Sequence, residues 1–232
     1  MMSEERMLDI VFQDEYLVAI NKPHGLLVHR SPIAADASEF AIQILRDQIN
    51  QKVFPVHRLD RKTSGVLLFA LNDEVNRLMQ EAFMNKNVDK TYLALVRGFT
   101  AESGTIDYAL TNDDGKTQDA ITHYKTIETF DIPVPFGKQP SSRYSLVEVA
   151  PETGRMHQIR KHFAHIFHPI IGDRPHGCNK QNKLFLEKWE MIKMLLHAQE
   201  ISFVHPISNE TIRIQAEMHE DFKKVLGLFR DF

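Results

Sequence analysis

A short charged stretch lies directly before an apolar run and contains one carboxylate among several cations. In V-H-R-L-D-R-K-T-S-G-V-L-L-F-A, residues 56–70, Asp60 has Arg58 and Arg61 within two residues. A turn does not need such a cluster, and a strand would avoid it. A carboxylate that is kept ionised in a partly dry cleft can act as a nucleophile. The alternative is a solvated turn with surface ion pairs, which contribute little to stability.

A second candidate lies in a predicted helix at residues 155–167. At about 100° per residue, its apolar stripe comprises Met156, Ile159, Phe163, Ile166 and Phe167. Arg160 falls at the edge of this stripe. A guanidinium so close to a buried face needs a partner, because an unpaired buried charge is costly. We expect a carboxylate from another element, and Asp60 is a candidate.

The other side of this predicted helix carries three histidines and a lysine: His157, Lys161, His165 and His168. They could form a phosphate-contacting surface for RNA, a metal site or a plain solvated face. A metal is disfavoured because Lys161 stands where a third ligand would be needed, and the helix has no acidic ligand. We therefore predict no metal site.

Composition sets broad limits on the kind of protein. The chain has 232 residues, 43% of them apolar, which is enough for one large domain or two small ones. Its net charge of −3 means that RNA binding would need a local basic patch. The only cysteine is Cys178, which excludes an intramolecular disulfide and fits a reducing compartment. Without a signal-peptide or membrane-spanning apolar run, we expect a cytoplasmic protein that does not associate with membranes.

The elements that must position these residues follow from periodicity and turn signals. Strands are predicted at residues 8–12, 16–20, 66–71, 91–96, 121–129, 144–149, 196–204 and 211–215. Helices are predicted from residue 41 to near 51, from 73 to 83, at 155–167 and near 183–193. Asp36 with Glu39, Asn72 and Thr153 are the expected helix caps. Because helices and strands do not alternate strictly, we predict an α+β fold with a mixed, largely antiparallel sheet and flanking helices.

Six blocks follow one another along the chain: N-K-P-H-G-L-L-V-H (21–29), H-R-L-D-R-K-T-S-G-V-L-L-F-A (57–70), K-T-Y-L-A-L-V-R-G (90–98), P-E-T-G-R-M-H-Q-I-R-K-H-F-A (151–164), H-P-I-I-G-D-R-P-H-G (168–177) and L-H-A-Q-E-I-S-F-V-H-P (196–206). In sequence and order they resemble the RluA-type pseudouridine synthases. The resemblance implies the pseudouridine synthase fold, in a single catalytic domain over residues 1–232 without an N-terminal S4 domain. V-H-R-S at 28–31 and the long stretch 168–182 resemble the branch that modifies uridine 65 of tRNA.

The resemblance also implies roles for individual residues. Asp60 corresponds to the nucleophile, and Arg160 to its ion-pair partner. Tyr92 corresponds to a tyrosine near the target base that is a candidate for proton transfer, although it could be only a strand aromatic. Ile159 would pack against the base. Arg58 would fill the space left by a flipped nucleotide, or form a second ion pair with Asp60.

Basic side chains around these residues would then contact RNA phosphates. They are Lys22, His29, Arg30, Arg61, Lys62, His157, Lys161, His165 and His168. The family's reaction needs no cofactor, and no protein partner is implied. The expected activity is conversion of a uridine in tRNA to pseudouridine. Alternatives are the same reaction on ribosomal RNA, a non-catalytic RNA-binding module and a histidine-dependent metallohydrolase.

Two features depart from the common pattern of the family. Met156 stands where Thr or Ser is usual after G-R, and we expect this to affect loop packing more than chemistry. Residues 178–193 match no general family motif, and we interpret them as an insertion that could determine substrate specificity.

Overall fold

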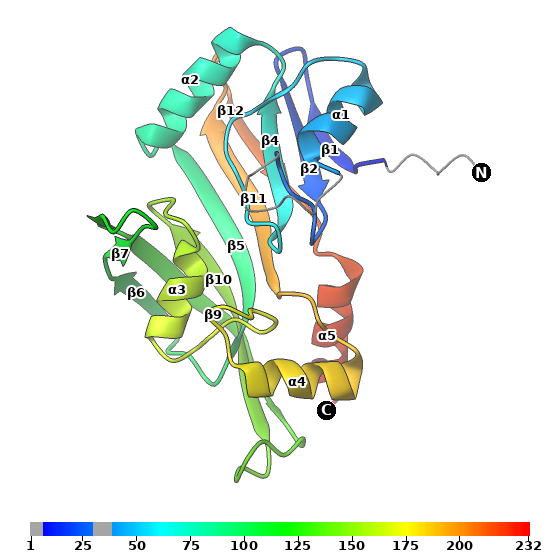
Figure 1. The fold of residues 1–232 in the computed structure, drawn as a ribbon, viewed down its shortest axis with the longest axis vertical. Coiled ribbons are helices and arrows are strands. Elements are labelled where there is room, and N and C mark those ends of the chain that lie inside the picture. Colours follow the sequence, from blue (N-terminus) through cyan, green and yellow to red (C-terminus); the bar gives the residue numbers. More distant parts are fainter. Residues whose placement is uncertain (1–6, 30–38) are drawn as a thin grey trace, which may run out of the picture. The chain divides into compact units, whose positions relative to one another are not determined.

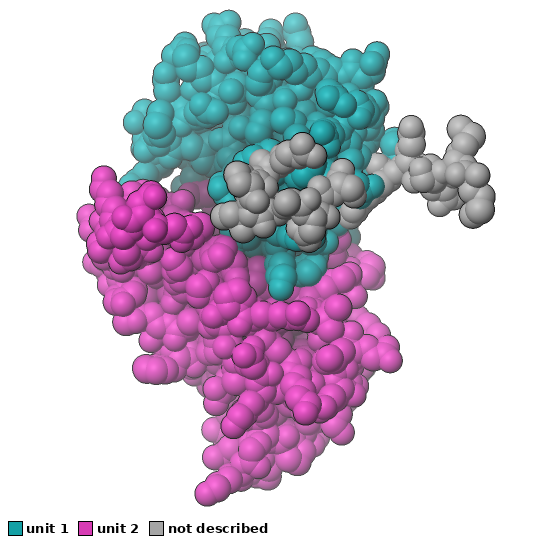
Figure 2. All heavy atoms as spheres, in the orientation of Figure 1, with its two compact units in different colours: residues 1–89, 198–217 teal, residues 90–197, 218–232 magenta. Residues whose placement is uncertain are grey.

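The computed structural model describes residues 7–29 and 39–232 of the chain. These residues form an α+β fold of mostly antiparallel strands with five helices (Figure 1), which confirms the predicted fold class. The chain packs into two compact units (Figure 2): unit 1 comprises residues 1–89 and 198–217, and unit 2 comprises residues 90–197 and 218–232. Neither unit is one continuous segment. A single catalytic domain stays a prediction.

Unit 1 is built on antiparallel strands with two helices. Its strands are β1 (Ile10–Gln13), β2 (Leu17–Lys22), β3 (Phe54–Pro55), β4 (Ser64–Ala70), most of β11 (Leu196–Val204) and β12 (Thr211–Gln215). The order is β1-β2-β4-β11, with β12 paired to β11 and β3 paired to β4. The helices are α1 (Ala41–Ile49) and α2 (Asp73–Met84). The Asn72 side chain accepts a hydrogen bond from the Val75 N–H at 2.9 Å, which confirms the predicted cap of α2. Asp36, which was expected to form a capping box with Glu39 before the first helix, lies outside the described residues.

Strand β4 is the centre of the core of unit 1. All seven of its residues are buried, which explains why its sequence from Val66 to Ala70 is continuously apolar rather than alternating. Gly65 has a φ of +108°, and a Cβ atom there would lie 2.1 Å from the backbone oxygen of Ala198 in β11. No side chain fits at this position, so the glycine permits the close approach of the two strands.

Unit 2 contains a second antiparallel set of strands and three helices. The strands are β5 (Val88–Arg97, whose first two residues belong to unit 1), β6 (Ser103–Asp107), β9 (Ile121–Ile132) and β10 (Ser142–Pro151), in the order β5-β10-β9-β6. Strands β7 (Leu110–Thr111) and β8 (Thr117–Gln118) pair separately. The helices are α3 (Gln158–His165), α4 (Asn179–Trp189) and α5 (Glu220–Arg230).

The two faces of the unit 2 strands bury different helices, because successive strand residues point to opposite faces. Ala94 and Val147 belong to a core cluster that contains Ile159 and Phe163 of α3. Leu95 and other residues of the opposite face belong to a cluster with Phe185 of α4 and Phe229 of α5. Helix α3, which carries the predicted site residues, therefore packs on one face, and α4 and α5 pack on the other.

Strands β11 and β12 have the predicted bounds, whereas two helices do not. Helix α3 begins three residues later than predicted, after His157, which has a left-handed conformation with a φ of +57°. The predicted cap by Thr153 is wrong: its hydroxyl accepts the Ile121 N–H and donates to Gln158 Oε1, which closes a loop instead. Helix α4 begins at Asn179 rather than near 183.

The predicted apolar stripe of the helix at 155–167 is partly wrong. Phe167 lies beyond the end of α3 and is 86% exposed, and Met156 precedes the helix and is also exposed. Because neither residue has helical geometry within α3, the periodicity that placed them on its buried face does not apply. Ile159 and Phe163 are buried as predicted.

Candidate active site

The charged stretch forms a loop of unit 1 between β3 and β4, and its first histidine anchors it. Nε2 of His57 accepts a hydrogen bond from the Leu68 N–H at 3.0 Å, which fixes this nitrogen as an acceptor. The imidazole also stacks on Phe83 of α2, with ring centroids 4.9 Å apart. At the other end of the loop, the Thr63 N–H donates to the carbonyl oxygen of Asp60 at 3.1 Å, which closes a turn. The main chain at Asp60 is thus fixed on both sides.

Lys22 supports this loop from inside unit 1. Its side chain is 0% exposed, and Nζ donates to the carbonyl oxygens of Leu26 at 2.9 Å, Pro23 at 3.0 Å and Arg61 at 3.3 Å. Gly25 and Arg61 are joined by two further hydrogen bonds, from the Gly25 N–H to the Arg61 oxygen and from Arg61 Nε to the Gly25 oxygen. The prediction that Lys22 contacts RNA phosphates is therefore wrong, because its charge is used to join residues 21–26 to the loop.

The other charged side chains of this loop lie nearer the surface of unit 1. Asp60 and Lys62 are half-buried, and Arg58 and Arg61 are exposed. Such exposure is compatible with contact to a substrate, in contrast to the buried Lys22. Their expected roles stay predictions.

In unit 2, Arg160 forms a buried ion pair that the sequence did not identify. Its Nε lies 2.8 Å from Oδ2 of Asp173, and its Nη2 lies 2.9 Å from Oδ1. The Arg160 side chain is 5% exposed and that of Asp173 is 1% exposed. The expectation that Arg160 needs a carboxylate from another element is confirmed, with Asp173 as that carboxylate. A further pair with Asp60 would join the two units and stays a prediction.

The turn that carries Asp173 is held by α4. Asn182 accepts the Gly172 N–H at 2.9 Å and donates to the Asp173 carbonyl oxygen at 2.7 Å. Gly172 has a φ of +81°, and a Cβ atom there would lie 2.1 Å from the Lys193 carbonyl oxygen. Residues 178–193 therefore position the ion-pair partner of Arg160, a role that their sequence alone did not indicate. The available signal was an aspartate after a glycine, directly behind the apolar pair Ile170-Ile171.

Tyr92 lies on the same side of unit 2 as α3. It is half-buried in β5 opposite Val149 of β10, and it packs against the core cluster that contains Ile159 and Phe163. Because Arg160 follows Ile159 directly, the structure brings these three predicted site residues to the same face of the unit 2 strands.

The four residues expected to form a basic stripe each contact a different part of unit 2. His157 precedes α3 and its Nδ1 lies 3.0 Å from Nε2 of His176, whereas His165 stacks on Tyr108 with ring centroids 3.7 Å apart. Lys161 Nζ donates to the Thr111 carbonyl oxygen at 3.4 Å. His168 Nδ1 donates to the carbonyl oxygen of Arg97 at 2.8 Å. These contacts do not support one continuous basic face. Within residues 7–29 and 39–232, no group of three or more His, Cys, Asp or Glu residues is arranged to hold a metal ion.

A buried histidine of α3 was not singled out by its sequence pattern. His162 is fully buried, with Nδ1 accepting from the Thr122 hydroxyl and Nε2 donating to the Tyr108 carbonyl oxygen, both at 2.9 Å. Burial lowers the pKa of His162 from its usual value. The neutral ring thus joins α3 to β9 and to the residue that follows β6.

Comparison with known proteins identifies the family. The sequence profile of the RNA pseudouridylate synthases matches residues 16–165, a range that includes Asp60, Tyr92 and Arg160. The chain belongs to the RNA pseudouridylate synthase family. This confirms the resemblance to RluA-type pseudouridine synthases, and the protein is an RNA pseudouridine synthase.

Relatives of this synthase share nearly its full length. A protein of Vibrio vulnificus (strain CMCP6) named tRNA pseudouridine synthase C is 47% identical, and the match covers 96% of each chain. A protein of the same name from Haemophilus influenzae (strain ATCC 51907 / DSM 11121 / KW20 / Rd) is 44% identical, over 96% of this chain and 98% of the relative.

Two human proteins of known structure have the same fold as the synthase. RNA Pseudouridylate Synthase Domain Containing 1 has a TM-score of 0.74 at 21% identity, over 99% of this chain and 97% of the human chain. RNA Pseudouridylate Synthase Domain Containing 4 has a TM-score of 0.73 at 25% identity, over 96% and 93%. In the part of the synthase that the structure describes, no helix is long and apolar enough to cross a membrane.

Proposed function

We propose that this synthase converts uridine 65 of tRNA to pseudouridine, with Asp60 as the nucleophile. The observation that carries the proposal is the near-full-length similarity to relatives named tRNA pseudouridine synthase C. A tRNA substrate also agrees with the cytoplasmic location expected from the sequence. The same reaction on ribosomal RNA is the alternative that the experiment below separates.

Asp60 is suited to nucleophilic attack by its position on a fixed backbone turn. The bonds of His57 and Thr63 fix the main chain on both sides of it, so the half-buried carboxylate needs little reorganisation before it meets substrate. The reaction is an isomerisation, in which the bond between C1′ and N1 breaks and a bond between C1′ and C5 forms. The C5 proton is lost, N1 gains a proton, and no redox change occurs. Asp60 can act by adding to the base or by attacking the sugar.

Arg160 and Tyr92 serve this chemistry from unit 2 in our proposal. Arg160 keeps Asp60 ionised, and its own orientation is set by the bidentate bond to Asp173. Tyr92 stacks near the target base and transfers a proton, and Ile159 contacts the base from the apolar side. Arg58 fills the space that the flipped nucleotide leaves. Arg61, Lys62, His157 and Lys161 contact phosphates, in keeping with the exposed Arg61 and half-buried Lys62.

Mapping of pseudouridine in total tRNA and ribosomal RNA, from cells with and without the gene, tests the proposal. We expect one signal, at position 65 of a few tRNAs, to disappear with the gene. Loss of a ribosomal RNA signal instead would contradict the substrate. The purified enzyme with a tRNA transcript should form pseudouridine when it is wild type and not when it carries Asp60→Ala. Turnover by Asp60→Ala would contradict the assignment of the nucleophile.

A further inference from the structure

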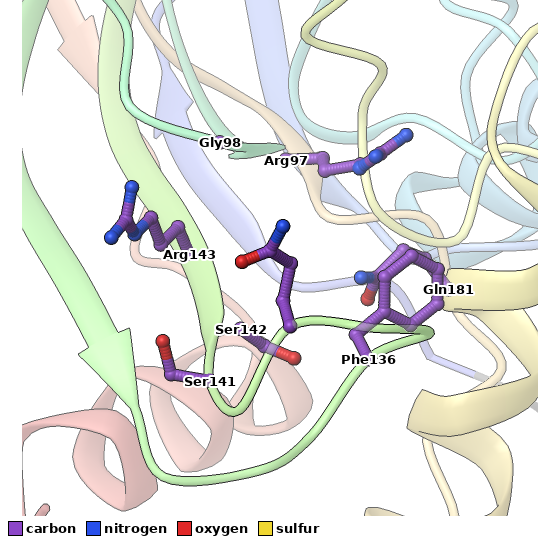
Figure 3. A pocket seen from close by; sticks show the side chains of 8 residues that line it. Arg97, Gly98, Phe136, Ser141, Ser142, Arg143 and Gln181 are labelled. Carbon is purple, nitrogen blue, oxygen red and sulfur yellow. The ribbon is translucent and has the colours of Figure 1, made fainter.

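Unit 2 contains a pocket of about 240 Å³ where β5 ends, β10 begins and α4 approaches the hairpin between β9 and β10 (Figure 3). Its wall includes two arginines, Arg97 and Arg143, the side chains of Ser141 and Gln181, and the ring of Phe136. None of the residues that line it is acidic. The pocket is therefore rich in cations and hydrogen-bond donors, and all of its residues belong to unit 2.

Gln181 gives the pocket a fixed and unused donor. Its side chain is 2% exposed, and its Oε1 accepts a hydrogen bond from the Tyr144 hydroxyl at 2.7 Å. Burial raises the pKa of Tyr144 to about 12, so this hydroxyl keeps its proton at neutral pH. The bond orients the carboxamide, and its Nε2 donates to no residue that the structure describes. Since Gln181 lines the pocket, this amide N–H is available to an acceptor that enters it.

Arg97 adds a cation that is not neutralised locally. Its backbone is fixed by the Pro169 carbonyl oxygen, which accepts its N–H at 3.0 Å, and its guanidinium lies 5.5 Å from the centre of the Phe136 ring. Phe136 is in turn held by a tight turn, in which it exchanges two backbone hydrogen bonds with Gln139. Over residues 7–29 and 39–232, Arg97 has no carboxylate partner.

Arg143 is a weaker contributor. Its Nε lies 3.3 Å from Asp131 Oδ2, and its guanidinium lies over the ring of Phe99, 5.2 Å from the ring centre. Figure 3 shows the Arg143 guanidinium on the side of the pocket away from Phe136 and Gln181. Its charge is thus partly compensated by Asp131, whereas the Arg97 guanidinium lies over the Phe136 ring.

We propose that this pocket binds a phosphate of the RNA backbone, held chiefly by Arg97 and Gln181. A phosphodiester offers only acceptors and carries one negative charge, which matches an unpaired guanidinium beside a fixed amide donor. The inference rests on the proposed function, because it takes the occupant to be part of the RNA substrate. It gives residues 178–193 a second task, since Gln181 in α4 supplies the amide donor. Arg97 and Gln181 are then RNA-binding residues outside the charged loop.

The test measures the affinity of the full chain for an unmodified tRNA transcript by fluorescence anisotropy, over a range of NaCl concentrations. Arg97→Gln should weaken binding about 10-fold at low salt and reduce the slope of log Kd against log salt by about 1. Gln181→Glu should weaken binding at least as much, because it places a carboxylate beside the phosphate. Arg143→Gln should cost only about 2-fold, in keeping with its pairing to Asp131. The matched control is Lys188→Gln, which removes one exposed charge from α4 outside the pocket and should change neither quantity.

An Arg97→Gln variant with the same affinity and salt slope as Lys188→Gln would overturn the proposal. Thermal unfolding shows whether Gln181→Glu is folded. If it is not, the result for Arg97→Gln alone decides, because Arg97 is exposed and its substitution should not affect folding. Inorganic phosphate is titrated in parallel against the side-chain amide signal of Gln181 by NMR. A shift of that signal without any change of RNA affinity in Arg97→Gln would mean that the pocket binds free phosphate and not RNA.

The binding test does not depend on turnover, so the two proposals can fail separately. If wild type binds tRNA but forms no pseudouridine, the proposed function fails while the effect of Arg97→Gln can still be measured. If wild type forms pseudouridine and Arg97→Gln binds normally, only the pocket proposal fails. Where both hold, Arg97→Gln should raise KM and leave kcat unchanged.

Discussion

In unit 1 the loop around Asp60 is held through its backbone, whereas in unit 2 Arg160 is held through its own charged group. The buried ammonium of Lys22 donates hydrogen bonds to carbonyl oxygens on the inner side of the loop. The acidic and basic side chains of the loop itself remain half-buried or exposed. Arg160 and Asp173 instead bury both charges and satisfy them against each other. A reactive side chain can stay accessible when other residues fix its backbone. A buried charged side chain that positions another group needs an oppositely charged partner of its own.

The largest expected effect is on chemistry without an effect on stability. Asp60→Asn should lose activity by a factor on the order of 10⁴ or more, since an amide is not a nucleophile. Because Lys22, His57 and Thr63 fix the main chain of the loop, and Asn has nearly the same size as Asp, affinity for tRNA and the melting temperature should stay close to wild type. Single-turnover assays and thermal unfolding check both. Retained turnover by Asp60→Asn would show that the Asp60 carboxylate is not the nucleophile.

Breaking the buried ion pair of unit 2 should lower the stability of the protein in addition to its activity. Asp173→Ala leaves the Arg160 guanidinium buried without its bidentate partner, which should cost about 3–5 kcal/mol in the free energy of unfolding. Chemical denaturation measures this cost. The matched control is the double variant Arg160→Met with Asp173→Leu, which should recover much of the stability and still lack activity. A double variant with normal activity would show that Arg160 is only structural.

Removing the support of the unit 1 loop should have a smaller effect. Lys22→Met leaves buried carbonyl oxygens without their donor, at a cost of about 1–3 kcal/mol. We expect kcat/KM to fall too, because the loop around Asp60 loses its inner support. Lys188→Met, at an exposed position, is the control for loss of a lysine. Unchanged stability in Lys22→Met would mean that the loop holds its shape without the ammonium.

The smallest effect concerns His162, which is buried and neutral in the same helix as Arg160. Its pKa is lowered on folding, so at mildly acidic pH the unfolded chain binds a proton that the folded chain excludes. Its contribution to stability is full above the usual pKa of about 6.5 and is lost as the pH falls through the lower folded value. Denaturation midpoints between neutral and mildly acidic pH should show this slope in wild type. His162→Asn should reduce the slope, and an identical slope would assign it to other groups.

Local signals predicted the elements that depend on local chemistry. The cap at Asn72, the buried strand after Thr63 and the bounds of β11 and β12 follow from turn residues and apolar runs. The start of α3 was missed because it depends on a distant contact, in which the expected cap Thr153 bonds Ile121 and Gln158 instead.

In the candidate site too, features set by local sequence could be predicted, and features set by contacts between distant segments could not. Both charged segments were recognised from residue type and spacing, and the need of Arg160 for a carboxylate followed from its position on a helix. The identity of Asp173 and the buried role of Lys22 could not be predicted, because each depends on which segments of the chain meet in the folded unit. Lys22 in particular had the appearance of a surface cation, since lysines are seldom fully buried.

The division of unit 1 into two stretches of sequence has a consequence for synthesis on the ribosome. Strand β4 is complete early, yet β11, its neighbour in the sheet, is translated only after nearly all of unit 2. Throughout that interval the seven buried residues of β4 lack part of their cover, and such an exposed edge favours association with other chains. The nascent synthase should therefore depend on chaperones from the time β4 emerges until residue 217 has been added.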